Sequence, residues 1–168
     1  MKKLILFFLL ASTTLYGQDA SGEYRHEIKL NGLNLVLGNP ELDYEYLINS
    51  NSGAGLYANA NIDRNHIWPF VYMAGAYYRL YLGGKHANGF FFEGGFNAIG
   101  FDDTEFGKNK VSSGWGPSFG IGGKFLIKKT IVMEFFGGLG RNFKATDEYN
   151  NYDIPVFPRW GISIGKRF

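Results

Sequence analysis

Charged residues recur at alternate positions within segments that are otherwise rich in glycine and large apolar side chains. Around Glu93, for example, the carboxylate stands opposite Phe92 and Phe96 in a two-residue alternation. Carboxylates and basic groups that share a buried interior must pair, because an unpaired buried charge is costly. These residues could therefore form an internal network of ion pairs. Its predicted members are Glu45, Arg79, Glu93, Lys124, Glu134, Arg159 and Arg167.

The residue types needed for other common chemistries are absent or scattered. The chain has no cysteine, which removes disulfides, thiolate metal ligands and a cysteine nucleophile. The three histidines, His26, His66 and His86, form no pair with metal-ligand spacing. Glycine pairs such as Gly94-Gly95 are not followed by the Gly-Lys-Ser/Thr of a phosphate-binding loop, and we expect them to allow close packing between strands. We therefore expect no enzyme activity, no metal and no cofactor.

The elements that position these charges are predicted to be strands. Apolar and polar residues alternate along the chain, and no long segment after residue 20 carries a helical period. Eight such runs can be followed, at about 24–37, 42–48, 54–62, 70–82, 90–98, 115–127, 131–139 and 159–168. In the first run the parity changes at Asn31-Gly32, which indicates a bulge, and Asn39-Pro40 predicts a tight turn. The polar segments Asp102–Ser113 and Lys144–Pro155 are predicted to be long links.

The beginning of the chain has the layout of a secretory signal. Lys2 and Lys3 precede an apolar run from Leu4 to Leu10, and small or polar residues follow as far as Gly17. We predict that residues 1–18 are a cleaved signal peptide and that residues 19–168 form a single domain. The chain has 17 basic and 15 acidic residues, so loss of the two signal lysines leaves equal numbers. This balance argues against a nucleic-acid partner bound through its phosphates.

Alternation alone does not say which face of a strand meets water, because a soluble sheet and a membrane barrel share the pattern. Here the charges lie in the middle of the runs among glycine and asparagine, while Tyr and Trp often lie near their ends, as at a membrane interface. Links alternate between short and long, which suits periplasmic turns and outer loops. An even number of strands can close without leaving an edge in lipid. The predicted fold is therefore all-β: an eight-stranded antiparallel up-and-down transmembrane β-barrel.

The last strand carries the most specific motif. Apolar residues at alternate positions lead to a final phenylalanine: Trp160, Ile162, Ile164 and Phe168. The motif resembles the terminal signature by which outer-membrane barrels are recognised for insertion, although Lys166 stands where an apolar residue is usual. The chain is similar to the small eight-stranded barrels of the OmpA or OmpX type from Gram-negative bacteria. The stretch from Ile28 through Tyr46 also resembles a bacteroidete-type barrel family of unknown function.

This resemblance implies a place in the cell outer membrane and carries over no catalytic residue. The expected partners are outer-membrane lipid, lipopolysaccharide and the barrel-insertion machinery, and the polar links are candidates for contact with a surface partner. An interior formed by eight strands is only wide enough for side chains to fill. We therefore expect a structural or surface-interaction barrel with a filled polar lumen.

Two alternatives remain open. One is a narrow or gated pore for small solutes. The other is a soluble periplasmic barrel that binds an apolar ligand, which would bury Phe92, Phe96 and Phe135 and expose Glu93 and Glu134.

Overall fold

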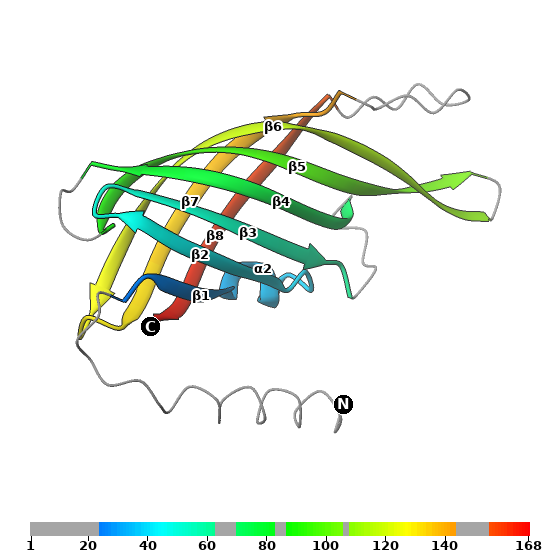
Figure 1. The fold of residues 1–168 in the computed structure, drawn as a ribbon. Coiled ribbons are helices and arrows are strands. Elements are labelled where there is room, and N and C mark those ends of the chain that lie inside the picture. The colour runs from blue at the N-terminus through cyan, green and yellow to red at the C-terminus, as the bar shows by residue number, and fades with distance from the viewer. Residues whose placement is uncertain (1–23, 63–69, 83–86, 106–107, 144–154) are drawn as a thin grey trace.

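The chain folds into a closed barrel of eight antiparallel strands, seen in a computed structural model that describes residues 24–62, 70–82, 87–105, 108–143 and 155–168 (Figure 1). Each strand pairs with the next along the chain, and β8 pairs with β1 to close the sheet. The elements are β1 (His26–Asn31), α2 (Gly32–Val36), β2 (Glu41–Asn49), β3 (Ser52–Ala60), β4 (Phe70–Tyr81), β5 (Gly89–Glu105), β6 (Lys108–Ile127), β7 (Ile131–Arg141) and β8 (Val156–Arg167). The predicted all-β, eight-stranded up-and-down fold is confirmed. The predicted signal peptide, residues 1–18, lies outside the described residues.

The two ends of the barrel differ. At one end, here called the terminal end, β1 begins, β8 ends, and tight connections join β2 to β3 and β6 to β7. At the other end, here called the helix end, β1 leads into α2. The β5–β6 hairpin projects beyond the other strands at the helix end (Figure 1). The barrel wall is therefore much taller on the β5–β6 side than on the β1–β2 side.

The first predicted run was wrong beyond Asn31. The chain forms a short helix there rather than a bulged strand that continues to Leu37. Asn31 caps this helix, because its side-chain oxygen accepts a hydrogen bond of 3.1 Å from the Asn34 backbone N–H. The helix ends before Gly38, whose φ of 78° lies in the left-handed region that glycine adopts without a steric penalty. The connection between β1 and β2 is thus a capped helix and not a tight turn at Asn39-Pro40.

The predicted long link Asp102–Ser113 was also wrong, because most of it is strand. β5 continues to Glu105 and β6 begins at Lys108, and the register pairs Asp103 with Lys110. The hydrogen bonds between paired strands are made by backbone groups, so polar side chains in this segment do not prevent strand pairing. Most of the second predicted link, Lys144–Pro155, lies outside the described residues.

The two faces of the wall have opposite character. On β5, the Phe92 side chain is 38% exposed on the outside, whereas Glu93 beside it is 1% exposed on the inside. On β6, Phe125 is 54% exposed and Lys124 is fully buried. Strand geometry produces this segregation, because successive side chains point to opposite faces. The barrel therefore has an apolar exterior around a polar interior.

Glycines on the inner face make room for large side chains that cross the interior. A Cβ atom on Gly75 would lie 2.8 Å from the Tyr57 ring, and one on Gly122 would overlap the Phe91 ring. Both contacts are closer than van der Waals packing allows, so an added methyl group would force neighbouring groups to shift. Among the described residues, no helix is long and apolar enough to cross a membrane.

Candidate functional site

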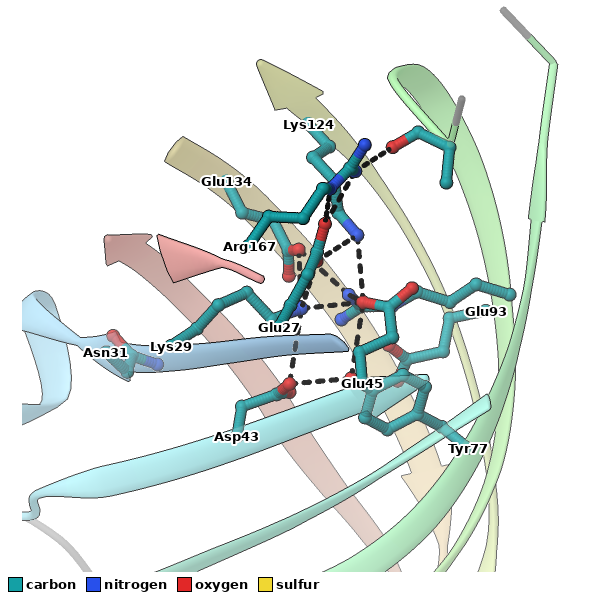
Figure 2. Close-up of polar contacts among 12 residues, drawn as sticks. Glu27, Lys29, Asn31, Asp43, Glu45, Tyr77, Glu93, Lys124, Glu134 and Arg167 are labelled. Carbon is teal, nitrogen blue, oxygen red and sulfur yellow. Dashed lines mark hydrogen bonds and ion pairs between the residues drawn. The ribbon is translucent and has the colours of Figure 1, made fainter. Parts of the chain in front are cut away.

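The interior of the barrel holds a network of buried ion pairs centred on Glu45 of β2. Its carboxylate lies 2.7 Å from Lys29 Nζ, 2.8 Å from Arg79 Nη1 and 2.9 Å from Lys124 Nζ (Figure 2). The Tyr81 hydroxyl also donates a hydrogen bond to it. These four donors come from β1, β4 and β6, so one carboxylate joins elements from all around the barrel.

Arg79 of β4 is the main basic centre of the network. Its guanidinium lies 2.8 Å from each of the Glu45, Glu93 and Glu134 carboxylates. The group also stacks over the Tyr77 ring, 4.2 Å from its centroid. The planar guanidinium fork suits such multiple pairing better than a lysine ammonium would. Arg79 is therefore held on every side by opposite charge or by an aromatic face.

Toward the terminal end the network continues through Glu27 of β1. This carboxylate accepts hydrogen bonds of 2.7 Å from both Lys124 Nζ and Arg167 Nε. A second Arg167 nitrogen donates to the Ala87 carbonyl oxygen at 3.0 Å. Arg167 thus ties the last strand to the first and to the β4–β5 connection.

Toward the helix end the network ends in a mixed polar and aromatic layer. Arg159 pairs with Glu93 and lies over the Tyr57 ring, 3.6 Å from its centroid. The Tyr57 hydroxyl donates to Asn97 Oδ1 at 2.5 Å, and Asn97 Nδ2 donates to Ser118 Oγ at 2.8 Å. In this layer the ion-pair network gives way to hydrogen bonds between uncharged side chains.

Apolar clusters fill the interior on both sides of the charges. Their side chains come from several strands and are at most 9% exposed. The cluster on the helix side contains Tyr57, Phe70, Met73, Tyr77, Ile99, Phe101 and Phe157, and the cluster on the terminal side contains Leu47, Tyr81, Ala87 and Phe91. Together with the ion pairs, they make the interior a packed core.

The structure brings all seven predicted network residues together inside the barrel. Sequence reasoning missed Glu27, Lys29 and Asp43, which are equally buried. Lys29 bridges Asp43 at 3.2 Å and Glu134 at 2.9 Å. The same two-residue alternation could have identified Glu27 and Lys29 as inward-facing. They flank the outward Ile28 in the same way as the predicted charges flank outward residues.

The predicted insertion motif lies on the outer face of the last strand. Trp160, Ile162 and Ile164 of β8 are 40% to 56% exposed. Phe168 follows the strand and exchanges backbone hydrogen bonds of 2.8 and 2.9 Å with His26. Its ring stacks on the His26 ring, with centroids 5.8 Å apart. The motif residues on β8 thus form part of the apolar exterior.

Within the described part of the chain, no three His, Cys, Asp or Glu side chains form a metal-binding group. His66 and His86 lie outside that part. In the described interior, five buried acids, Glu27, Asp43, Glu45, Glu93 and Glu134, are each paired with a lysine or an arginine. The network of buried ion pairs holds the barrel walls together and excludes solvent from the interior.

Comparison with known proteins identifies the fold. No protein-family model matches the chain, and no curated protein matches its sequence. Among solved structures, the N-terminal β-barrel domain of OprF from Pseudomonas aeruginosa is similar, with a TM-score of 0.64 and 11% sequence identity. The match covers 88% of this chain and 100% of that domain. The chain therefore shares the β-barrel fold of that domain.

Proposed function

We propose that this chain is an integral β-barrel of the outer membrane, with a structural or surface-interaction role and a lumen closed by its own side chains. The proposal rests on the distribution of side chains, which is the reverse of that in a soluble barrel: apolar side chains lie outside and charged side chains lie inside. Phe119, Phe125 and Leu139 are each more than half exposed on the outside, while Lys124 and Glu134 are buried inside. Soluble monomers rarely expose continuous apolar surface of this extent.

Aromatic residues near both ends of the wall support the same placement. Tyr46 and Tyr78 are exposed near the terminal end, and Tyr72 and Trp115 are exposed toward the helix end. Membrane barrels carry such girdles where the hydrocarbon meets the headgroups, because these rings have an apolar body and a polar tip. The start of β1 and the end of β8 then lie on the periplasmic side, and α2 and the β5–β6 hairpin lie toward the outside of the cell.

The packed interior favours a closed barrel over a pore. Ions and water would have to pass both apolar clusters and the ion pairs of Arg79 with three carboxylates. The soluble alternative required Phe92, Phe96 and Phe135 to be buried and Glu93 to be exposed, and the exposures run the other way.

Outer-membrane location is proposed from this exterior and from the likeness to the OprF barrel. The partners that follow are outer-membrane lipid, lipopolysaccharide at the outer rim, and the machinery that inserts barrels. Trp160, Ile162, Ile164 and Phe168 are the residues proposed for recognition by that machinery.

Heat-modifiable migration tests the proposal. The folded protein should migrate differently from the boiled protein on a detergent gel and should fractionate with outer membranes. Recovery of the folded protein in the soluble periplasmic fraction would overturn the membrane assignment. In planar bilayers we expect no stepwise conductance. Regular single-channel steps would show that the barrel is a pore and that its lumen is not closed.

A further inference from the structure

A cavity opens at the terminal end of the barrel, between the start of β1, the β2–β3 turn, the β6–β7 turn and the end of β8. Its volume is about 480 Å³, which lies in the range of pockets that bind small molecules. Leu47 and Arg167 line its inner part and are 5% and 4% exposed, whereas Lys129 is exposed at its opening. This space, here called the mouth cavity, has a described lining that includes Arg25, Leu47, Asn49, Ser50, Lys129 and Arg167.

Every charged residue in the described lining of the mouth cavity is basic. Arg25, Lys129 and Arg167 reach it from three different segments of the chain. The same bias extends along the surrounding rim, because residues 24–26, 47–52, 127–131 and 165–168 include no Asp or Glu, and the α-carboxylate of the last residue is the acidic group that they add. The basic residues of these segments are Arg25, Lys128, Lys129, Lys166 and Arg167. The mouth cavity is therefore a positively charged region.

The buried acid that pairs with Arg167 is shared with a second base. Glu27 accepts hydrogen bonds of 2.7 Å from both Arg167 Nε and Lys124 Nζ (Figure 2). One carboxylate thus faces two cations, and the cavity lining adds Arg25 and Lys129 above them. The positive charge at this end of the lumen therefore exceeds what Glu27 can neutralise.

Backbone hydrogen bonds hold the segments that carry the basic residues. The Leu47 N–H donates to the Arg25 carbonyl oxygen at 2.7 Å. The Arg167 N–H donates at 2.7 Å to the carbonyl oxygen of Thr130, which follows Lys129 in the turn. The three basic side chains therefore extend from a fixed frame, and a site whose frame is formed in advance loses less entropy when a ligand binds.

We propose that the mouth cavity binds a small water-soluble anion that carries two or more carboxylate or phosphate groups. Guanidinium groups bind both kinds of oxyanion through paired hydrogen bonds, and a lysine adds a point charge. Because the bases come from separate segments around the cavity, they favour a ligand with more than one anionic group. Asn49 adds an uncharged donor: its Oδ1 accepts a hydrogen bond of 2.8 Å from the Asn51 backbone N–H, so its amide nitrogen is the atom it can offer to a ligand.

The position of the cavity favours a soluble ligand over a lipid headgroup. Leu47 and Arg167 are buried on the inner face of the wall, whereas lipid contacts the outer face of a membrane barrel. In the proposed orientation the terminal end faces the periplasm, so the ligand would come from that compartment. This last step rests on the proposed function, but the binding site itself does not.

Calorimetric titration of the folded barrel in a non-ionic detergent tests the proposal. The probes are citrate and pyrophosphate, added at constant ionic strength in a buffer without divalent cations. We expect at least one of them to bind at a single saturable site per barrel. Binding of citrate alone would assign the site to carboxylates, and binding of pyrophosphate alone would assign it to phosphates; either result supports the proposal.

Two neighbouring lysines provide a matched pair of variants. Lys128 and Lys129 are both exposed in the β6–β7 turn and have φ values of 51° and 65°, but of the two only Lys129 lines the cavity. Lys129→Gln should weaken binding of the probe about tenfold, because it removes a charge-assisted contact. Lys128→Gln makes the same change in net charge and should bind the probe as the wild type does.

Absence of saturable binding of both probes to the wild-type barrel would overturn the site. Equal weakening by Lys128→Gln and Lys129→Gln would also overturn it, since it would mean that the anion responds to the overall charge of the rim and not to the cavity. Neither result would bear on the membrane location, which migration and fractionation test without these anions.

Discussion

Glu45 and Lys124 approach to 2.9 Å although their strands, β2 and β6, lie on opposite sides of the barrel. In a closed ring of eight strands these two are four positions apart in either direction. Their contact shows that the side chains span the whole interior, with both carboxylate and ammonium groups fully buried. The lumen is thus closed across its diameter by charge pairing, which leads to the following expectations.

Replacement of Arg79 by methionine should strongly destabilise the barrel. The change removes the shared partner of Glu45, Glu93 and Glu134 and leaves buried carboxylates undercompensated. Loss of one partner from a buried pair costs about 3–5 kcal/mol. Urea unfolding in detergent micelles, followed by tryptophan fluorescence, measures this free energy. Lys129→Met, in the exposed β6–β7 turn, is the control, and an equal effect of both changes would contradict the role given to the network.

Tyr77→Phe should destabilise the barrel by about 1–3 kcal/mol. The Tyr77 hydroxyl donates to Asp43 at 2.6 Å inside the barrel, and its loss leaves a buried charged acceptor with one donor fewer. Tyr78, the next residue, faces outward and is 45% exposed, so Tyr78→Phe serves as the matched control with little expected change. Unfolding free energies that do not differ between these variants would count against the inward hydrogen bond.

Gly75→Ala should cost about 1–3 kcal/mol, because the added methyl group would overpack the interior. Its Cβ would lie 2.5 Å from Asn97 Oδ1 and 2.8 Å from the Tyr57 ring. Gly94 has nothing within 4 Å of an added Cβ, so Gly94→Ala should leave stability unchanged or slightly raised. The comparison is made by urea unfolding. A Gly75→Ala barrel as stable as the Gly94→Ala barrel would mean that the interior is loosely packed.

Phe168→Ala should reduce assembly into outer membranes while it leaves folding in detergent nearly intact. The proposed recognition depends on the aromatic side chain, whereas the hydrogen bonds of Phe168 to His26 are made by the backbone. The fraction of heat-modifiable protein in outer-membrane preparations, compared with refolding yield in micelles, separates the two effects. Equal assembly of the variant and the wild type would remove Phe168 from the recognition motif.

The sequence predicted the fold well because the two-residue period is a direct consequence of strand geometry. It failed at Leu33 and Leu35, whose alternation resembles a strand although they lie in the Asn31-capped helix. Capping and a following Gly38 competed with the periodicity and determined the local structure.

The network was only partly predictable. Alternation tells which charges share a face, but it cannot tell that Glu45 contacts Lys124, because that pairing depends on closure and strand stagger. Alternation also cannot tell which of several consecutive aromatic residues faces the interior. Phe90, Phe91 and Phe92 follow one another, and only Phe91 is buried inside, since an aromatic ring suits both a packed interior and an apolar exterior.

The central claim is that the apolar outer face of the barrel lies in lipid. It is tested most directly by measuring whether lipid or water surrounds the outer face of β6. The chain has no native cysteine, so single cysteines at Phe119, Phe125 and the turn residue Lys129 can carry spin labels in barrels reconstituted into phospholipid vesicles. We predict that labels at 119 and 125 collide mainly with dissolved oxygen, which concentrates in lipid, and that the label at 129 collides mainly with a water-soluble nickel complex. Nickel accessibility at 119 and 125 equal to that at 129 would contradict the account.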